Sequence, residues 1–493
     1  MLEALAGIFK LHVLVPWILA MFFGIFVGGV PGLTATMAVA LLVPLSYYMS
    51  PIAGLAMIIG VEFTAIFAGD IPATFLRIPG TPASGAAILD GYELTKKGKG
   101  SLALSIDLVA SALGGLVGIL ILIFISSALA NFALKFTNFE YFWMGVFGLS
   151  MSAIITTGSK IKGLFSVLLG LLVSTVGMDI TTGYPRFTFG ITNLMSGVNF
   201  ILVMIGLFGL SEALKYISNP ASLKMPSINE KISITFRSIF GILWKFKKTF
   251  FASSLIGTIV GALPGAGADI AAWVAYGTSK KTSKNKESFG HGNIEGVIAP
   301  TSANNAALGG TWIPTLVFGI PGDSITAIVL GAMMMYGLTP GPLIFQQNRA
   351  LVNSIFSIAL ISQLLLVIIG FIGIKSYSYI LKLPRNVIMT GVIIFSMVGS
   401  YALNNNVFDI GVMLFFGILG FLFEKAGIPL PPLILALILG PMIENNLRIG
   451  LVKTSGNLLP FFTRPISFTL VIIIIISFFG DSMLKLIKNK MRR

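Results

Sequence analysis

GVPGLTATMA, residues 29–38, interrupts a hydrophobic run that is otherwise long enough to cross a bilayer, and GALPGAGADI, residues 261–270, does the same in the second half of the chain. In each case a Pro-Gly pair and several small residues stand where an unbroken apolar helix would be expected. A second pair of such interruptions follows, RIPGTPASGAAIL at 77–89 and GIPGDSITAIVLG at 319–331. These four Pro-Gly segments organise the rest of the sequence.

The composition is that of a membrane protein. The 493 residues are 55% hydrophobic and 10% charged, with a mean hydropathy of +0.94, whereas soluble domains carry about 25% charged residues. Apolar runs at 350–373, 407–423 and 465–480 approach or reach the roughly 20 residues that span a bilayer. Residues 11–30 are expected to form a membrane segment and not a signal peptide, because no small-residue cleavage site follows them.

Charge and residue usage exclude several classes of function. The net charge is +15, but the basic residues gather in a few hydrophilic breaks and at the C-terminus, as in cytoplasmic loops, so nucleic-acid binding is not expected. Cysteine is absent, which excludes disulfides and thiolate metal sites. His12 and His291 are the two histidines, too few for a multi-histidine centre. No cofactor is expected beyond a coupling ion, either sodium or a proton.

The order and spacing of the Pro-Gly segments predict an internal duplication. Pro31 and Pro264 are 233 positions apart, and Pro79 and Pro321 are 242 apart. Near-equal offsets in the same order are what a repeat produces. Unrelated helix kinks in a glycine-rich protein are the alternative.

Loop charges predict that the two copies are inverted. The turn after the first interruption is uncharged in copy one, around Ser50, but reads SKKTSKNK at 279–286 in copy two. After the second interruption the pattern reverses, with TKKGKG at 95–100 and LTPGPLIFQQ at 338–347. If lysine marks the cytoplasmic side, equivalent loops lie on opposite sides of the membrane.

We therefore predict an all-α polytopic membrane protein with two inverted-topology repeats, broken helices, re-entrant hairpins and roughly 10–14 membrane segments. The N-terminus is expected outside and the C-terminal tail in the cytoplasm. The predicted parts are a first repeat (1–217), a basic cytoplasmic linker (218–248), a second repeat (249–446) and a C-terminal transmembrane helix with a basic tail (447–493).

The interruptions are predicted to form an anion site. Broken helices survive in a membrane only inside protein or beside water, and exposed N–H groups at helix starts suit a carboxylate. Close helix packing by small residues is the alternative for each glycine, serine or threonine. The candidate substrate-binding residues of the interruptions are Gly32, Thr34, Thr36, Gly80, Thr81, Ser84, Gly265, Gly267, Gly322, Ser324 and Thr326.

Three aspartates near the interruptions are candidates for the coupling-ion site, because acids inside a membrane are costly and usually functional. They are Asp70, Asp269 and Asp323. Each could instead cap a helix start. Arg77 could pair with a bound carboxylate or anchor the chain at the membrane interface.

Two other functions compete with transport. Broken helices also line ion channels, so an anion channel is one alternative. GAGAD at 265–269 is similar to the Gly-x-Gly-Asp motif of intramembrane aspartyl proteases, although its spacing differs by one residue. That chemistry would require Asp269 and Asp70 to share a proton.

The chain resembles the large membrane subunit of the tripartite tricarboxylate transporters. The resemblance runs from about residue 20 to 465 and is carried by GGVPGLTATMAVALLVP, RIPGTPASGAAILDGYELTKKGKG, STVGMDITTGYPRFTFG, GALPGAGADIAAWVAYG, FGHGNIEGVIAPTSANNAALGG, PTLVFGIPGDSITAIVLGAMMMYGLTPGP and LILALILGPMIENNLRIGL. Where the family usually has Glu this chain has Thr301, and where it usually has Gly and Ser this chain has Asp70.

The resemblance implies a non-enzymatic secondary transporter of a prokaryotic inner membrane. Its expected partners are a small four-helix membrane subunit and an extracytoplasmic solute-binding protein. Its expected cargo is citrate, a smaller dicarboxylate or another organic acid anion, and elevator-type alternating access is implied by analogy. Within APTSANNAALGG (299–310), Ser302, Asn304 and Asn305 become further substrate-binding candidates, since amides can bind a carboxylate.

Overall fold

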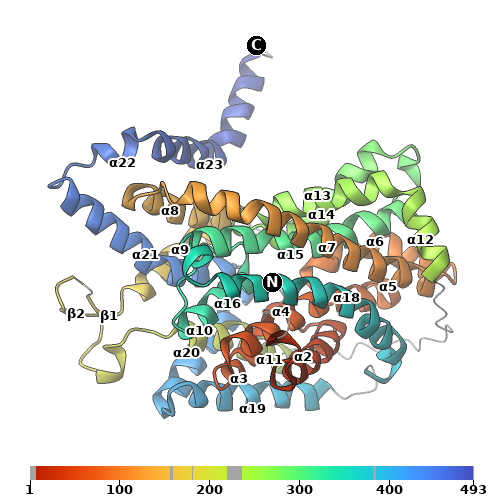
Figure 1. Ribbon diagram of the computed structural model, residues 1–493, viewed down its shortest axis with the longest axis horizontal. Helices are drawn as coiled ribbons and strands as arrows, with labels where there is room; N and C mark the ends of the chain where they lie inside the picture. The colour runs from red at the N-terminus through yellow and green to blue at the C-terminus, as the bar shows by residue number, and fades with distance from the viewer. Residues whose placement is uncertain (1–6, 156–158, 180, 219–235, 381–384, 492–493) are drawn as a thin grey trace. The chain divides into compact units, whose positions relative to one another are not determined.

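The computed structural model describes residues 7–155, 159–179, 181–218, 236–380 and 385–491, and within these ranges the chain is almost entirely helical (Figure 1). The pair of strands found there, β1 (Gly177–Met178) and β2 (Pro185–Arg186), is antiparallel and two residues long. Eight helices of the described residues are long and apolar enough to cross a membrane. The predicted all-α multi-pass class is confirmed.

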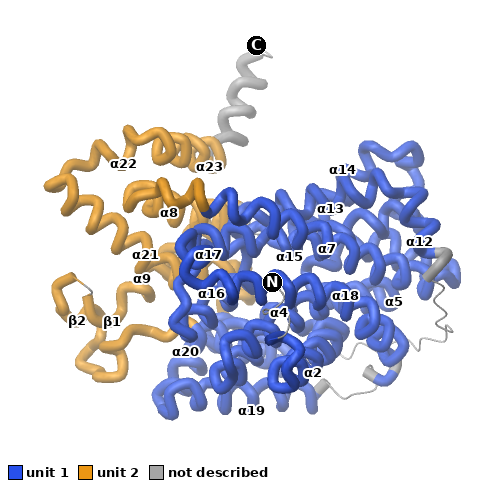
Figure 2. The backbone as a smooth tube through the Cα atoms, viewed as in Figure 1, with its two compact units in different colours: residues 1–130, 201–421 blue, residues 131–200, 422–493 orange. Residues whose placement is uncertain are grey.

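The chain forms two compact units, each built from two stretches of sequence (Figure 2). Unit 1 comprises Met1–Ala130 and Ile201–Phe421, and unit 2 comprises Asn131–Phe200 and Leu422–Arg493. All seventeen candidate site residues belong to unit 1.

The helices of unit 1 are α2 (Leu11–Gly29), α3 (Ala35–Ser46), α4 (Pro51–Ala68), α5 (Asp70–Leu76), η1 (Pro82–Gly85), α6 (Ile88–Lys96), α10 (Phe200–Met204), η3 (Ile205–Leu210), α11 (Ser211–Ser218), α12 (Phe236–Lys245), α13 (Lys247–Gly261), α14 (Gly267–Thr282), η4 (Lys286–Ser288), α15 (Ile294–Phe318), α16 (Ser324–Met335), α17 (Ile344–Gln347), α18 (Arg349–Ile380) and α19 (Arg385–Asn404). Two helices begin in unit 1 and end beyond it, α7 (Gly100–Ala133) and α20 (Val407–Lys425).

The Pro-Gly segments break helices as predicted. The first one separates α2 from α3, and its equivalent separates α13 from α14. The α13 and α14 helices have 15 and 16 residues. At about 1.5 Å per residue, each is shorter than the roughly 30 Å of a bilayer core. Residues 247–282 therefore form two short helices, α13 and α14, joined at a break.

Within each copy, a glycine at an equivalent position brings two helices into close contact. A Cβ added at Gly28 in α2 would lie 2.2 Å from the carbonyl oxygen of Ala65 in α4, and one added at Gly261 in α13 would lie 2.3 Å from that of Ala307 in α15. Small residues allow such backbone approach in membranes. The two contacts are related by the same offsets of 233 and 242 positions that relate the Pro-Gly segments.

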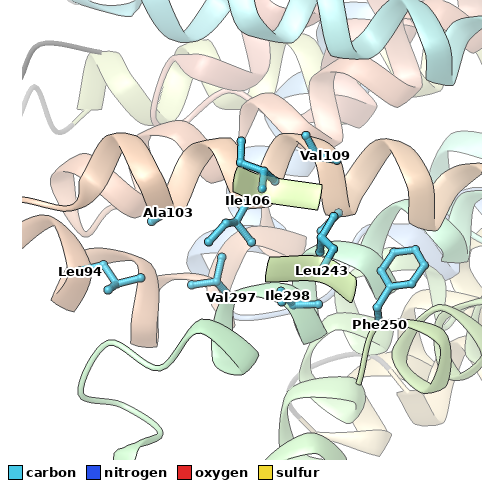
Figure 3. Close-up of a cluster of buried hydrophobic side chains, with 10 residues drawn as sticks. Leu94, Ala103, Ile106, Val109, Leu243, Phe250, Val297 and Ile298 are labelled. Carbon is cyan, nitrogen blue, oxygen red and sulfur yellow. The ribbon is translucent and has the colours of Figure 1, made fainter. Parts of the chain in front are cut away.

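A hydrophobic cluster holds the start of α15 against its neighbours in unit 1 (Figure 3). Ile106 of α7, Leu243 of α12 and Phe250 of α13 pack with Val297 and Ile298 of α15, and all five are buried. This packing fixes the helix that carries the APTSANNAALGG segment.

The predicted basic linker, 218–248, is partly helical. Residues 219–235, including Lys224 and Lys231, lie outside the described residues. The remainder forms α12 and the first residues of α13, and the side chain of Lys247 lies over the ring of Trp244 with its Nζ 4.4 Å from the centroid. The described part of the segment, 236–248, is therefore mostly helical.

Unit 2 contains α8 (Asn138–Ile155), α9 (Lys160–Ser174), the two strands, η2 (Thr192–Leu194), α21 (Pro431–Lys453), α22 (Leu459–Thr463) and α23 (Pro465–Met491). The α21 helix packs against both α8 and α9. The tail lysines and arginines belong to the end of α23 or follow it, where no side chain is described.

An ion-pair network ties the loop after α9 to α21. Arg186 Nη1 lies 2.6 Å from Glu444 Oε1, and Arg448 Nη2 lies 2.9 Å from Asp179 Oδ2. The hydrogen bond from Arg448, with backbone donors at Thr182 and Thr181, holds the pKa of Asp179 below its ordinary value.

Candidate functional site

The first interruption of copy one is a capped helix start. Thr34 is the N-cap of α3, and its hydroxyl oxygen accepts from the backbone N–H of Met37 at 3.1 Å. Gly32 has a φ of +93° and is exposed, a conformation for which glycine is the usual residue. Thr36 is half-buried in the first turn of α3. The equivalent of Gly32 in copy two, Gly265, has a φ of +84°.

The second interruption of copy one packs directly against the first. A Cβ at Gly80 would lie 2.3 Å from the carbonyl oxygen of Gly28, and the Gly80 N–H donates to Gly69 O at 3.1 Å. Thr81 and Ser84 then form a capping box around η1, with the Thr81 N–H donating to Ser84 Oγ at 3.0 Å. Both side chains are buried.

Copy two repeats this arrangement. The Gly265 N–H donates to Gly322 O at 2.6 Å, so its two interruptions also meet. Asp323 and Thr326 form the capping box of α16, with Asp323 Oδ1 accepting from the Thr326 N–H at 2.8 Å. Gly267 lies beside this box, since a Cβ there would be 3.0 Å from the Asp323 Cβ. Ser324, the first residue of α16, is half-buried.

Several N–H and hydroxyl groups that the sequence predicts as donors to an anion already have hydrogen-bond partners within the chain. The N–H groups of Gly80 and Gly265 donate to backbone carbonyls, and the side chains of Thr81, Ser84 and Thr326 are engaged in caps. Asp323 adopts the helix-capping role that the sequence left open. A buried amide needs a partner, and here another segment of the chain supplies it. Substrate binding by these residues stays a prediction.

The APTSANN segment contributes buried polar groups to the middle of α15. The Ser302 hydroxyl donates to Ile298 O at 2.7 Å, within the helix. Asn304 Nδ2 donates to Asp70 Oδ2 at 3.1 Å, while Asn304 Oδ1 has no hydrogen-bond partner among the described residues. Neither side-chain amide atom of Asn305 has one there either, although Asn305 is fully buried.

Two hydrogen bonds across the copies are reciprocal. Asn304 in α15 binds Asp70 at the start of α5, and Trp312 Nε1 in α15 donates to Glu62 Oε2 in α4 at 3.2 Å. With the 242-residue offset, 62 corresponds to 304 and 70 corresponds to 312. Equivalent positions therefore contact each other in both directions, as they do across an isologous interface.

The three candidate acids have different surroundings. Asp70 is fully buried at the first position of α5, where the N-cap is Gly69, and its carboxyl group interacts with that of Asp107 of α7. Asp269 is exposed in the first turn of α14 and interacts electrostatically with Asp323. Asp70 and Asp269, the two aspartates of the protease alternative, thus have different carboxyl neighbours.

Arg77 is exposed and follows α5 in a left-handed conformation, with a φ of 60°. Its equivalent, Gly319, ends α15 with a φ of 67°. The guanidinium of Arg77 lies 5.8 Å from the centroid of the Tyr92 ring. Among the described residues no group of three or more His, Asp or Glu side chains could hold a metal ion.

Asp90 is a buried acid that the sequence analysis did not single out. Its Oδ1 accepts from the N–H groups of Gly290, Gly292 and Asn293 at 2.7–2.9 Å, and its Oδ2 accepts from the Tyr276 hydroxyl at 2.9 Å. It fixes α6 of copy one to α14 and to the loop before α15 in copy two. Asp107 and Glu62 were also missed, although each is an acid within a strongly apolar run, which is the signal that would have found them.

Comparison with known proteins places the chain in a family. The model of the family described as tripartite tricarboxylate transporter TctA matches residues 14–435. An Agrobacterium vitis protein described as an uncharacterised 52.8 kDa protein in the TAR-I ttuC' 3' region is 35% identical over 454 residues, which are 91% of this chain and 88% of that protein.

A second Agrobacterium vitis protein, described as uncharacterised and in the TAR-II ttuC' 3' region, is 38% identical over 214 residues, which are 43% of this chain and 88% of that protein. No solved structure matches the chain. The family is a membrane component of a tripartite system that also has a small membrane subunit and a binding protein. The chain belongs to the tripartite tricarboxylate transporter TctA family.

Proposed function

We propose that the chain is the large membrane subunit of a secondary active importer of tricarboxylates or related organic acid anions. An extracytoplasmic binding protein delivers the anion to it, and a sodium or proton gradient drives entry. The two repeats lie in opposite orientations, with the N-terminus outside and the tail in the cytoplasm. Alternating access is of the elevator type.

The reciprocal pair of hydrogen bonds is the observation that carries this proposal. Along α4 and α5 the contacts run from Glu62 to Asp70, while along α15 they run from Trp312 back to Asn304. The two equivalent segments therefore pass each other in opposite directions. Many secondary transporters consist of two repeats in opposite orientations, whose broken helices meet in the middle of the membrane. Their substrate site lies where these helices meet.

The unsatisfied amide of Asn305 supports a substrate site at this crossing. A buried polar group without a partner is costly, and such groups in native proteins call for an explanation such as a ligand or water. The Asn305 Nδ2 is a donor, so it can bind a carboxylate oxygen, and the half-buried Thr36 and Ser324 hydroxyls at two helix starts add donors of the same kind.

Uptake of labelled citrate, with a panel of other tricarboxylates and dicarboxylates, tests the proposal in proteoliposomes that contain the chain with its small membrane subunit. We expect saturable uptake that requires the binding protein and an inward sodium or proton gradient. Asn305→Leu is expected to abolish uptake, while Asn193→Leu, an exposed asparagine in unit 2, leaves it unchanged. Passive, non-saturating conductance in place of gradient-driven uptake would overturn the proposal in favour of a channel.

A further inference from the structure

Two buried carboxyl groups in unit 1 contact each other. Asp70 lies at the start of α5, and Asp107 lies about two turns into α7; neither side chain is exposed. The two carboxyl groups lie close enough to interact with each other, and each acts on the ionisation of the other. The pair is distinct from the helix caps at the Pro-Gly segments, because neither of its members caps a helix.

The hydrogen bonds of the pair leave one oxygen of each carboxyl group without a donor. Asp70 Oδ2 accepts from Asn304 Nδ2 at 3.1 Å, and Asp107 Oδ1 accepts from Ser111 Oγ at 3.1 Å. The other two oxygens, Asp70 Oδ1 and Asp107 Oδ2, are buried and have no donor among the described residues. An ionised carboxyl group only accepts hydrogen bonds, so a bond between these two groups requires a proton on one of them.

Among the described residues, no basic side chain neutralises the pair. The groups that act on the two carboxyls, within the described chain, are Asn304, Ser111 and each other. The remaining ionisable groups on the elements packed around them are engaged elsewhere or exposed. They are Glu62, bonded to Trp312; Asp90, bonded to Tyr276 and the loop amides; Glu93, paired with Lys96; Glu295, bonded to Thr249 and Ser283; and the exposed Arg77, Lys245, Lys247, Lys248, Arg349 and Lys375.

We propose that Asp70 and Asp107 form a proton-binding pair, with the proton held between Asp70 Oδ1 and Asp107 Oδ2, and that this pair is the coupling-ion site of the transporter. The second statement rests on the proposed function, whereas the first does not. Two carboxyl groups in direct contact do not both ionise and instead hold a proton as a unit. Hard cations take about six or more oxygen ligands, far more than the two free oxygens of this pair with Asn304 Oδ1.

Asn304 connects the pair to the substrate-binding candidates. Its Nδ2 is bonded to Asp70 and its Oδ1 is free, while the neighbouring Asn305 has both amide atoms unpaired. When the shared proton is bound to Asp70, this carboxyl group loses its negative charge, so the strength of the hydrogen bond that it accepts from Asn304 depends on the protonation of the pair. Loading of the pair and the orientation of a substrate-facing amide are thereby linked.

Infrared spectroscopy of the purified full-length chain, grown with ¹³C-carboxyl aspartate, tests proton binding without any substrate. We expect an isotope-shifted C=O band of a protonated carboxyl at neutral pH, lost in an Asp70→Asn, Asp107→Asn double variant and retained in Asp409→Asn, a buried aspartate bonded to Asn404. Added sodium should leave the band unchanged. A wild-type spectrum without this band, or a band that sodium removes, would overturn the proton-binding pair.

Transport by the reconstituted complex tests the coupling. In Asp107→Asn, citrate uptake driven by a pH gradient should fall to the rate measured without a gradient, while exchange of external for internal citrate continues. Asp70→Asn, in which the Asn304 contact also changes, should behave likewise. Full gradient-driven uptake in either variant would overturn the coupling role. If the wild-type complex transports no organic acid, the proposed function fails, and the infrared result still decides whether the pair holds a proton.

Discussion

Replacing Asp90 by alanine should destabilise unit 1 more than most single substitutions. The carboxylate accepts four hydrogen bonds, three from the backbone N–H groups of Gly290, Gly292 and Asn293 and one from Tyr276. Each donor left unsatisfied costs about 1–3 kcal/mol. The loop is partly exposed, so water can replace some of these bonds, and the lower end, about 4 kcal/mol in total, is the expected loss.

Thermal unfolding of the detergent-purified protein measures this loss. For a chain of this size we expect Tm to fall by roughly 4–8 °C, extrapolating from smaller domains. Tyr276→Phe removes one of the four donors and should lower Tm by about a quarter as much. Glu93→Ala, in the same helix, removes only an ion pair with the exposed Lys96 and should not shift Tm measurably. An unchanged Tm in Asp90→Ala, or an equal loss in Tyr276→Phe, would refute the reasoning.

Three further outcomes are expected, each checked by the same unfolding assay. Gly28→Ala should destabilise the protein by about 1–3 kcal/mol or prevent folding, because its Cβ would overlap the α4 backbone. Gly277→Ala, with open space around it, should stabilise α14 by up to ~1 kcal/mol. Equal effects of the two substitutions would contradict the contact between Gly28 and α4. Thr34→Ala should cost about 1 kcal/mol through loss of the α3 cap, and Thr34→Ser should restore most of it. Arg448 lowers the pKa of Asp179 in the folded state, so the stability that Asp179 adds is present above its unfolded pKa of about 3.9 and is lost as the pH falls below that value. Asp179→Asn should therefore lower Tm at neutral pH, and the difference from the wild type should shrink in acid. A difference in Tm that does not depend on pH would exclude this cause.

The positions of the helix breaks were predictable from sequence because their causes are local. Proline and glycine at 31–32 and 264–265 end helices wherever they occur in the fold, and Thr34 lies at the spacing from which a hydroxyl caps a helix start. The offsets of 233 and 242 positions were visible for the same reason. The structure then repeats them in contacts that the sequence does not encode locally, such as Gly28 with Ala65 and Gly261 with Ala307.

The hydrogen-bond partners of the groups at the helix breaks were not predictable in the same way. The sequence suggested free amides and hydroxyls, but Gly80 donates to Gly69, and Gly265 donates to Gly322. These partners lie 11 and 57 positions away, so the pairing depends on how the two interruptions fold onto each other. The partner of Asp70 was missed for a similar reason, since Asp107 lies on another helix and is brought close only by tertiary packing.

The two copies share a geometry but not a chemistry, and the difference bears on where an ion can act. Asp70 of copy one corresponds to Trp312 of copy two, and Asn304 corresponds to Glu62, so each reciprocal hydrogen bond joins an acid to a neutral donor. In both bonds the acid belongs to copy one. The neutral donors lie on α15 of copy two, beside the unpaired Asn305. Anionic cargo is repelled by carboxylates and bound by amides, so in the proposed importer the substrate is expected on copy two and the cation on copy one. Under this proposal the cation site and the anion site are separate, and the hydrogen bond between Asp70 and Asn304 links them.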